Sequence, residues 1–255
     1  MIFSTLTFNM QNGQPWNEAE PDRTETDIAQ TVDFLRGQDA DVVFLQEVER
    51  GYEGGAQIEP PPNYTRLREA LKGYDSVFGY PIANELEIPF GLGLAIFSKT
   101  KLRDFQRIDL DPAGVEFEYD GVARKPSHRL LLQATTVLGG RTVGLLNTHL
   151  QAFFMIGASS ADHRGQRDAI EAALRAQAGP ALLAGDFNCA PGEGVVEQFG
   201  LAGFHPAQNS AITWRRMPYV LDHIFYNAPF RLEACQVLPT LASDHHAVRA
   251  EFSFI

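Results

Sequence analysis

Asp186 and Asn188 are the residues of this chain whose types and spacing most directly suggest chemistry. They follow residues 181–184, a short apolar run that predicts a buried strand, and Gly185 allows the backbone to turn without a side-chain penalty. Because side chains alternate along a strand, residues two apart point to the same side. An Asx turn that closes a strand would also explain this pair, and by itself such a pair is more often structural.

Similar polar residues stand at the ends of other apolar segments. They are Asn9, Glu47, Asn147, His149, Asp222, His223, Asp244, His245 and His246. Each motif alone has a structural explanation, such as a capped turn, an exposed acid or a satisfied histidine. Their repetition at strand ends instead favours a shared site built from acids, carboxamides and histidines.

These residue types suit a divalent metal and proton transfer. Mg²⁺ and Mn²⁺ prefer carboxylate and carboxamide oxygens and are typically held by one or two carboxylates, waters and a substrate phosphate. Glu47, with Asn9 nearby, suits that role, and the lack of thiolates beside it argues against structural zinc. Phosphoester hydrolysis needs an activated water and neutralised phosphoryl oxygens, and a histidine oriented by a carboxylate can transfer the proton.

The composition limits the class of protein. The chain has 255 residues, of which 44% are hydrophobic and 21% charged, and we expect one globular domain over residues 1–255. A net charge of −11 disfavours long nucleic acid, although bound cations could reverse the potential inside a deep site. We therefore expect a phosphorylated small molecule or a short phosphodiester as substrate.

The cysteines and the N-terminus bear on the cellular compartment. The two cysteines, Cys189 and Cys235, predict reduced thiols rather than a disulfide framework. The first residues lack the pattern of a signal peptide, and no segment approaches the roughly 20 apolar residues of a membrane span. We expect a cytoplasmic enzyme without a transmembrane segment, and a leader removed by processing is compatible with this sequence. The sequence indicates no protein partner.

Strands and helices alternate along the chain. We expect helices over residues 22–37, with Asp22 as N-cap and Gly37 as the stop, 67–71 and 161–176. The expected strands cover residues 1–9, 41–47, 76–80, 91–98, 102–110, 129–137, 142–149, 181–184, 220–226, 232–238 and 246–254. Many strands, short turns and few helices predict an α+β fold, in which two mainly antiparallel sheets pack face to face with helices outside.

The order of the motifs resembles the endonuclease/exonuclease/phosphatase superfamily over nearly the whole chain. The motifs are Thr7-Phe8-Asn9, Leu45-Gln46-Glu47-Val48, Gly93–Ser98, Asn147-Thr148-His149-Leu150, Gly185–Pro191, Leu221–Phe225 and Ser243–His246. The resemblance implies the four-layered DNase-I-like sandwich. It also implies a hydrolase of phosphoester bonds, a phosphodiesterase or a phosphatase, that uses Mg²⁺ or Mn²⁺.

The resemblance implies ligands for the metal and for the phosphate. Glu47 would be the main metal ligand, Asn9 would bind metal or orient water beside it, and Asp244 would contribute to the metal site. His149 would stabilise charge that develops on the phosphate, and Asn188 would contact its oxygens.

It also implies the groups that move protons. Asp186 would position or deprotonate the attacking water, and His245 would act in proton transfer, held in its tautomer by Asp222. Which of Asp186 and His245 is the base stays open, as does the choice between one metal and two.

Three positions depart from the family pattern or are ambiguous. The family often has Asp-Tyr where this chain has Asp222-His223, and alternation predicts a packing role for His223. His246 is expected to be a core or surface histidine. Either Glu85 or Glu87 could orient the middle histidine, as a glutamate does in some members.

Loops are expected to set the substrate. Arg124, Arg129, Trp16 and Trp214 are candidate substrate contacts, although a single arginine is more often a solvated surface charge. The apolar run 153–156 beside His149 could be core, a lid or a face for an apolar substrate group, and it favours core or lid packing over contact with lipid.

Three other functions compete with a small-molecule phosphoesterase. The same site would serve an endonuclease, an exonuclease or a DNA-repair enzyme, although the acidic charge and the lack of a basic stripe count against it. A sphingomyelinase-like phospholipid hydrolase is less favoured, since neither a secretion signal nor a membrane anchor is evident. A catalytically silent binding module would not need intact acids and histidines at every motif.

Overall fold

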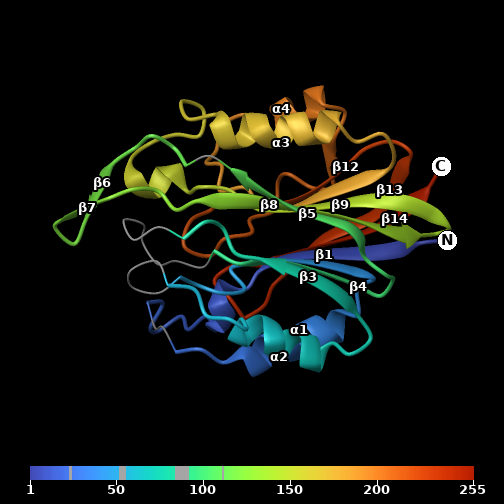
Figure 1. The fold of residues 1–255 in the computed structure, drawn as a ribbon, viewed down its shortest axis with the longest axis horizontal. Helices are drawn as coiled ribbons and strands as arrows, with labels where there is room; N and C mark the ends of the chain where they lie inside the picture. Colours follow the sequence, from blue (N-terminus) through green and yellow to red (C-terminus); the bar gives the residue numbers. More distant parts are fainter. Residues whose placement is uncertain (23–24, 52–55, 84–91, 111) are drawn as a thin grey trace.

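Two β-sheets packed face to face form the centre of the molecule, and helices cover both outer faces (Figure 1). The computed structural model describes residues 1–255 except 23–24, 52–55, 84–91 and 111. The first sheet has the order β13 (Phe230–Leu238), β14 (Ala247–Phe254), β1 (Phe3–Asn9), β2 (Val42–Gln46), β4 (Leu94–Ser98) and β3 (Asp75–Gly79). The second has the order β11 (His205–Pro206), β12 (Asp222–Tyr226), β10 (Ala181–Asp186), β9 (Arg141–His149), β8 (Arg129–Leu138) and β5 (Arg103–Leu110).

The helices form the outer layers. Beside the first sheet lie α1 (Ile28–Gln38) and α2 (Pro62–Ala70), and beside the second lie α3 (Gly165–Arg175) and α4 (Val195–Leu201). Each sheet contains a single parallel pair among the described strands, β1 with β2 and β9 with β10. The predicted α+β sandwich of two mainly antiparallel sheets is therefore confirmed.

Alternating side chains explain why the central strands are apolar throughout. In β2, Val42 and Phe44 enter the core between the sheets, whereas Val43 and Leu45 pack toward α1 and α2. A strand that is buried on both faces needs apolar residues at every position rather than at every second one. The core between the sheets takes residues from Phe3 to Phe252, so both ends of the chain contribute to it.

The first helix begins later than the sequence predicted. Helix α1 starts at Ile28, where Asp27 Oδ1 accepts a hydrogen bond from the Ala29 amide at 3.2 Å, so the predicted N-cap Asp22 was wrong. The Asp27 amide donates to the Gly13 carbonyl at 2.7 Å, and this contact ties the preceding chain to the first loop. Gly37 lies inside the helix, which ends at Asp39 in the left-handed conformation.

Some elements had no clear sequence signal. Helix α4 and a short hairpin, β6 (Phe117–Tyr119) with β7 (Val122–Arg124), form in segments for which the sequence predicted neither a helix nor a strand. Both cysteines are free, as predicted. None of the helices in the described part of the chain is long and apolar enough to cross a membrane.

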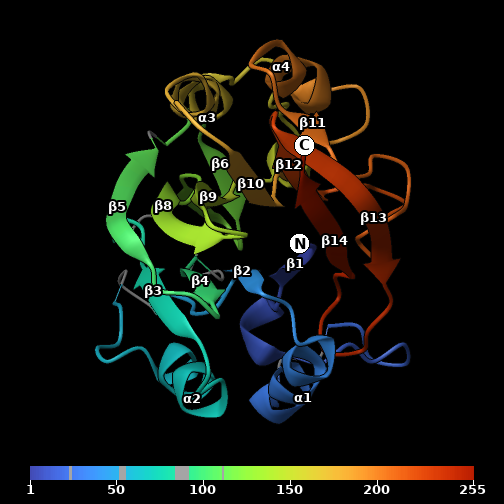
Figure 2. The ribbon, with the colours of Figure 1, turned by 90° about the vertical axis from the view of Figure 1, so that its right-hand side faces the viewer.

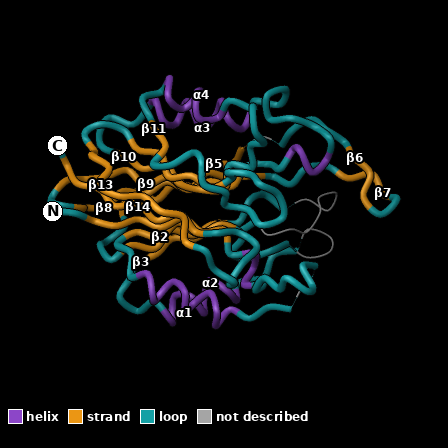
Figure 3. The backbone as a smooth tube through the Cα atoms, turned by 180° about the vertical axis from the view of Figure 1, so that it is seen from behind, coloured by secondary structure: helices purple, strands orange, loops and turns teal. Residues whose placement is uncertain are grey.

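The topology gathers many polar strand ends at one end of the sandwich. Strands β1, β2, β9 and β10 finish there, and the antiparallel partners β12 and β14 start there. Long loops surround this end (Figure 3). Both chain termini lie at the opposite end, which faces the viewer in Figure 2.

A buried polar contact joins the two sheets close to that end. The Asn147 Nδ2 of β9 donates to the carbonyls of Leu45 and Ala95 in the first sheet, at 2.9 Å each. Asn147 Oδ1 accepts from Gln46 Nε2 at 2.8 Å, and Gln46 Nε2 also lies 3.1 Å from Thr7 Oγ1. These side chains are fully buried, so each lost partner would leave a polar group without water.

We expect Asn147→Ala to lower the free energy of unfolding by about 2–4 kcal/mol, because it removes three buried hydrogen bonds between the sheets. Chemical denaturation followed by circular dichroism measures this change. The matched control is Asn209→Ala at an exposed position, for which a change within about 0.5 kcal/mol is expected. Equal stability of the two variants would show that the contact between the sheets contributes nothing.

Candidate active site

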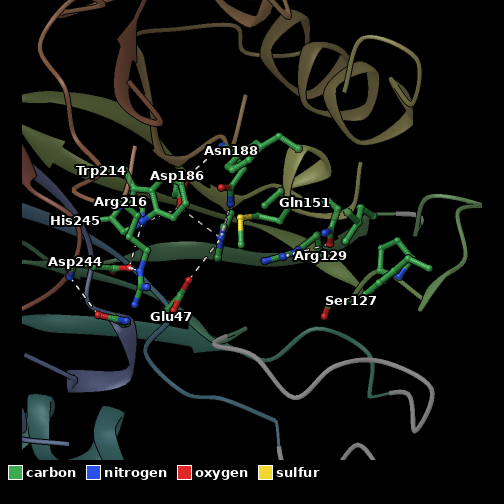
Figure 4. A pocket seen from close by; sticks show the side chains of 18 of the residues that line it. Glu47, Ser127, Arg129, Gln151, Asp186, Asn188, Trp214, Arg216, Asp244 and His245 are labelled. Atoms are coloured by element: carbon green, nitrogen blue, oxygen red, sulfur yellow. Dashed lines mark hydrogen bonds and ion pairs between the residues drawn. The ribbon is translucent and has the colours of Figure 1, made fainter. Parts of the chain in front are cut away.

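The strand ends bring the acids and histidines of the sequence motifs into one group (Figure 4). Asp186 at the end of β10 lies beside His149 of β9 and opposite Asp222 of β12 in the sheet register. Glu47 follows β2 directly, with a left-handed φ of 51°, and its carboxylate reaches the same group from the first sheet. The site therefore lies across the gap between the two sheets.

Gly185 is required by the close approach of two strands. Its φ is +154°, and a Cβ atom at this position would overlap the backbone oxygen of Thr148 in β9. Only glycine allows β10 to lie this close to β9, and this approach sets the position of Asp186.

Asn9 binds two carboxylates. Its Nδ2 donates to Glu47 Oε1 and to Asp186 Oδ2, at 3.0 Å each. The Gln11 amide donates to Asn9 Oδ1 at 3.1 Å, and this contact fixes the orientation of the carboxamide. The structure thus turns the amide nitrogen toward the acids, whereas a metal ligand would present its oxygen. Asn9 holds Glu47 and Asp186 in place.

Asn188 connects Asp186 to His149. Its amide N–H donates to Asp186 Oδ1 at 3.0 Å, while Nδ2 lies 2.9 Å from His149 Nε2 and 3.0 Å from the Leu150 carbonyl. Asn188 has left-handed backbone geometry, with φ 46°, and lies beyond the last residue of the strand. Asp186 and Asn188 do face one site, but a turn brings this about rather than strand alternation.

His149 is a neutral, buried imidazole. Burial, followed by the charges of Arg129 and His245, lowers its pKa well below the ordinary value. Since Asn188 donates to Nε2, the ring proton lies on Nδ1. Within the described part of the chain, Nδ1 has no hydrogen-bond partner. Glu85 and Glu87, the candidates for orienting this ring, lie outside the described residues.

His245 is a cation held by carboxylates. Its Nδ1 lies 2.8 Å from Asp222 Oδ2, and its Nε2 lies 3.8 Å from Asp186 Oδ2. Burial lowers the pKa of His245, but Asp222, Asp186 and Asp244 outweigh it and raise the pKa to about 10. A protonated ring with one nitrogen bound by Asp222 directs its other N–H toward Asp186.

The acids of the site repel one another, and the nearby positive groups offset only part of this repulsion. Burial and the nearby Asp244 raise the pKa of Glu47 to about 7. Burial and the charge of Asp222 likewise raise the pKa of Asp186. Carboxylates that repel one another in a buried pocket are stabilised by a bound cation, so this group of acids fits a divalent ion.

Two sets of ligands are available to such an ion. Asp186, Asp222 and His245 place ligand atoms within 4.8 Å of one another. In that set the Asp222 carboxylate already binds the His245 ring. Glu47 and Asp244 offer hard oxygens at the pocket surface, which matches an ion that keeps several waters and takes one or two carboxylates. Glu47 and Asp244 are therefore a second set of candidate ligands for a divalent ion.

Asp244 is held by residues whose role the sequence did not reveal. Its Oδ2 accepts from Trp214 Nε1 at 3.2 Å and from Arg216 Nε at 3.0 Å. Arg216 also binds Asp22 at 2.8 Å and lies over the Trp16 ring, 5.3 Å from its centroid. No motif links these segments, and only the folded chain brings the loop of Arg216 to Asp244.

A pocket of about 270 Å³ opens onto these groups. Arg129 and Trp214, which were predicted substrate contacts, line it. Trp16 and Arg124, the other two predicted contacts, do not line the pocket. The Trp16 ring lies against the Arg216 guanidinium, and Arg124 belongs to β7. The pocket thus has a polar floor of strand-end residues and walls made of loops.

The two additional histidines lie away from the reacting groups. His223 is buried, with its ring packed against Phe187 and Phe225 and its Nδ1 3.2 Å from the Gln208 carbonyl. That arrangement agrees with a packing role. His246 is half-buried and does not line the pocket.

Residues 6–245 match the model of the endonuclease/exonuclease/phosphatase family, and the chain belongs to this family. No curated protein matches the chain at a significant level.

Solved structures match the whole chain at low identity. A family member from Beutenbergia cavernae is 21% identical with a TM-score of 0.73, and the match covers 99% of this chain and 72% of that one. A mannosyl-6-phosphatase from Bacteroides thetaiotaomicron is 17% identical with a TM-score of 0.63, over 99% and 100% of the two chains. The human Nocturnin catalytic domain with bound sulfate is 19% identical with a TM-score of 0.65, over 100% and 95%. These similarities establish the DNase-I-like fold.

We expect Glu47→Gln to weaken Mn²⁺ binding by at least about 10-fold, because glutamine keeps the shape but removes the charge that attracts the ion. Isothermal titration calorimetry measures the affinity. Glu49→Gln is the matched control, since Glu49 is buried two residues away and accepts from the Tyr64 amide at 2.9 Å. An unchanged affinity in Glu47→Gln would exclude Glu47 as a ligand.

Proposed function

We propose that this protein is a divalent-metal-dependent phosphoester hydrolase that acts on a phosphorylated small molecule or a short phosphodiester. The observation that carries the proposal is the line of contacts from Asp222 through His245 to Asp186, which ends at a pocket that Glu47 and Asp244 also line. These contacts direct the His245 imidazole and the Asp186 carboxylate toward the same pocket. It is the arrangement that proton transfer at a phosphoester requires.

The residues divide the reaction between them. Bound Mg²⁺ or Mn²⁺ would neutralise charge on the phosphoryl oxygens. Asp186, whose pKa is raised, orients the attacking water and accepts its proton. His245, whose pKa is about 10, stabilises negative charge or protonates the leaving oxygen. Asn188 places its carboxamide next to the reacting phosphate. The Asn9 amide nitrogen donates to both Glu47 and Asp186 and so holds the two carboxylates in place.

The pocket and the charge favour a substrate of modest size. A volume of about 270 Å³ lies just below the usual range for small-molecule sites. A net charge of −11 would repel a long polyanion along most of the surface. One of the similar structures is named a mannosyl-6-phosphatase, which is a phosphatase of a small phosphorylated molecule on the same fold.

We expect wild-type protein to hydrolyse bis(p-nitrophenyl) phosphate or p-nitrophenyl phosphate only with Mg²⁺ or Mn²⁺ present. Removal of the proton-transfer groups in Asp186→Ala and His245→Ala should each lower kcat by at least about 100-fold. Release of p-nitrophenolate provides the measurement.

Matched controls are Asp168→Ala and His205→Ala, which change exposed residues that do not line the pocket and should keep full activity. Full activity in Asp186→Ala and His245→Ala would contradict the proposal. Cleavage of oligonucleotides in preference to small phosphoesters would favour the nuclease alternative, and cleavage of phospholipid head groups the sphingomyelinase-like one. A protein that binds Mn²⁺ but cleaves none of these would be a binding module.

A further inference from the structure

One wall of the pocket is apolar, and it comes from a single turn of 3₁₀ helix, η3 (Phe153–Ile156). Phe153 is 1% exposed and stacks on the His163 ring with the centroids 5.2 Å apart. The next three residues, Phe154, Met155 and Ile156, line the pocket, and Met155 is 61% exposed. The helix therefore buries one residue as an anchor and presents the other three to the pocket.

Hydrogen bonds hold this wall in place beside the reacting groups. The Glu193 carboxylate accepts from the hydroxyls of Ser159 and Ser160, at 2.7 Å each, and from the Ser160 amide at 3.0 Å. It also accepts from the Ala190 amide at 2.9 Å. Because Ala190 lies two residues after Asn188, the buried Glu193 ties the loop of the wall to the loop of the active site.

The wall continues to His245 through aromatic rings. Phe154 lies 5.7 Å from Trp214, and Trp214 lies 6.1 Å from the His245 ring, measured between centroids. Trp214 also donates to Asp244, so its ring is fixed relative to the acids. Apolar surface therefore reaches the edge of the reacting centre on the side of His245.

A substrate made only of phosphate and hydroxyl groups would gain little from such a wall. Exposed apolar side chains that are anchored at a pocket mark the place of an apolar ligand group. Two aromatic rings and a thioether are a surface against which a flat ring packs well, by edge or face contacts and by sulfur–aromatic contacts.

We infer that the pocket selects phosphoesters whose alcohol carries an aromatic ring, which lies against Phe154, Met155 and Trp214 next to His245. The phosphate lies at Asp186 and Asn188. The inference rests on the proposed function and adds the chemical class of the substrate to it. If the wall only excluded water, it would serve all phosphoesters alike, and this difference can be measured.

The test uses non-hydrolysable phosphonates, so that binding is separated from chemistry. Benzylphosphonate should bind the wild-type protein with Mn²⁺ about 10-fold or more tightly than methylphosphonate, because the ring buries apolar surface. Isothermal titration calorimetry measures both affinities. Met155→Gln should reduce this advantage about 3-fold or more, whereas Leu201→Gln, at a site 78% exposed on α4 and outside the pocket, should leave it unchanged.

Two further measurements make the test specific. Cyclohexylmethylphosphonate should bind less tightly than benzylphosphonate, and Phe154→Leu should remove that difference. Benzyl phosphate and methyl phosphate are esters of alcohols of similar acidity, so the ratio of their kcat/KM values reports the pocket rather than the leaving group. Met155→Gln should lower that ratio.

The outcomes separate the two proposals. Equal affinities for benzyl- and methylphosphonate, in a protein that hydrolyses phosphoesters, would overturn this inference alone. An equal loss of kcat/KM for both esters in Met155→Gln would also overturn it, because the wall would then only exclude water. Tighter binding of the cyclohexyl compound would overturn the choice of an aromatic ring. If the wild-type protein binds neither phosphonate and hydrolyses no phosphoester, the proposed function fails and this inference fails with it.

Discussion

The carboxamide of Asn147 fixes the register of one sheet against the other, and the site depends on this register. Asn147 bonds to Gln46, to Leu45 and to Ala95 across the gap between the sheets. Glu47 is the next residue after Gln46, and His149 is two residues after Asn147. A shift between the sheets would therefore separate the acid on one sheet from the histidine on the other. The hydrogen bond from Asn9 of the first sheet to Asp186 of the second sheet also joins the two sheets, at the end where the site lies.

The site places like charges together where water is scarce, and this arrangement costs stability. Glu47 and Asp186 both have raised pKa values, because burial and neighbouring acids disfavour their ionised forms. His245 offsets part of this cost, and Asp222, Asp186 and Asp244 raise the pKa of its ring to about 10. Left-handed geometry at Glu47 and Asn188 adds local strain. Strained and desolvated groups persist where the surrounding fold determines their positions, and here two sheets and the bonds of Asn9 do so.

The sequence predicted the architecture and the residues at the strand ends, because both follow from local periodicity. Apolar strands that finish in an acid, a carboxamide or a histidine are visible without knowledge of the fold. Contacts between distant segments are not visible in this way. Nothing around Asn9 indicates that its nitrogen binds Glu47 and Asp186, which are 38 and 177 residues away.

The same limit applies to the residues of the loops and to the start of the first helix. Trp16 and Arg124 were chosen because they are large or charged and lie in loops, but the path of each loop decides whether such a side chain reaches the pocket. The first helix was extended back to Asp22 because a suitable cap residue precedes a helical pattern. Asp27 caps the helix instead: its side chain accepts from the Ala29 amide, and its own amide donates to the Gly13 carbonyl in the distant first loop.

The floor and the walls of the candidate site have separate structural origins. The acids, carboxamides and histidines of the candidate site stand at the ends of strands, where a shift of one residue would disturb both sheets. The walls of the pocket come from the 3₁₀ turn after β9 and from the loops that carry Lys125 and Trp214. Such loops can change without altering the sheet register. Structures that share as little as 16–21% identity with this chain keep the fold over nearly its whole length. The fold therefore persists through wide changes in sequence, and the residues that face the pocket must be read from the loops of each structure.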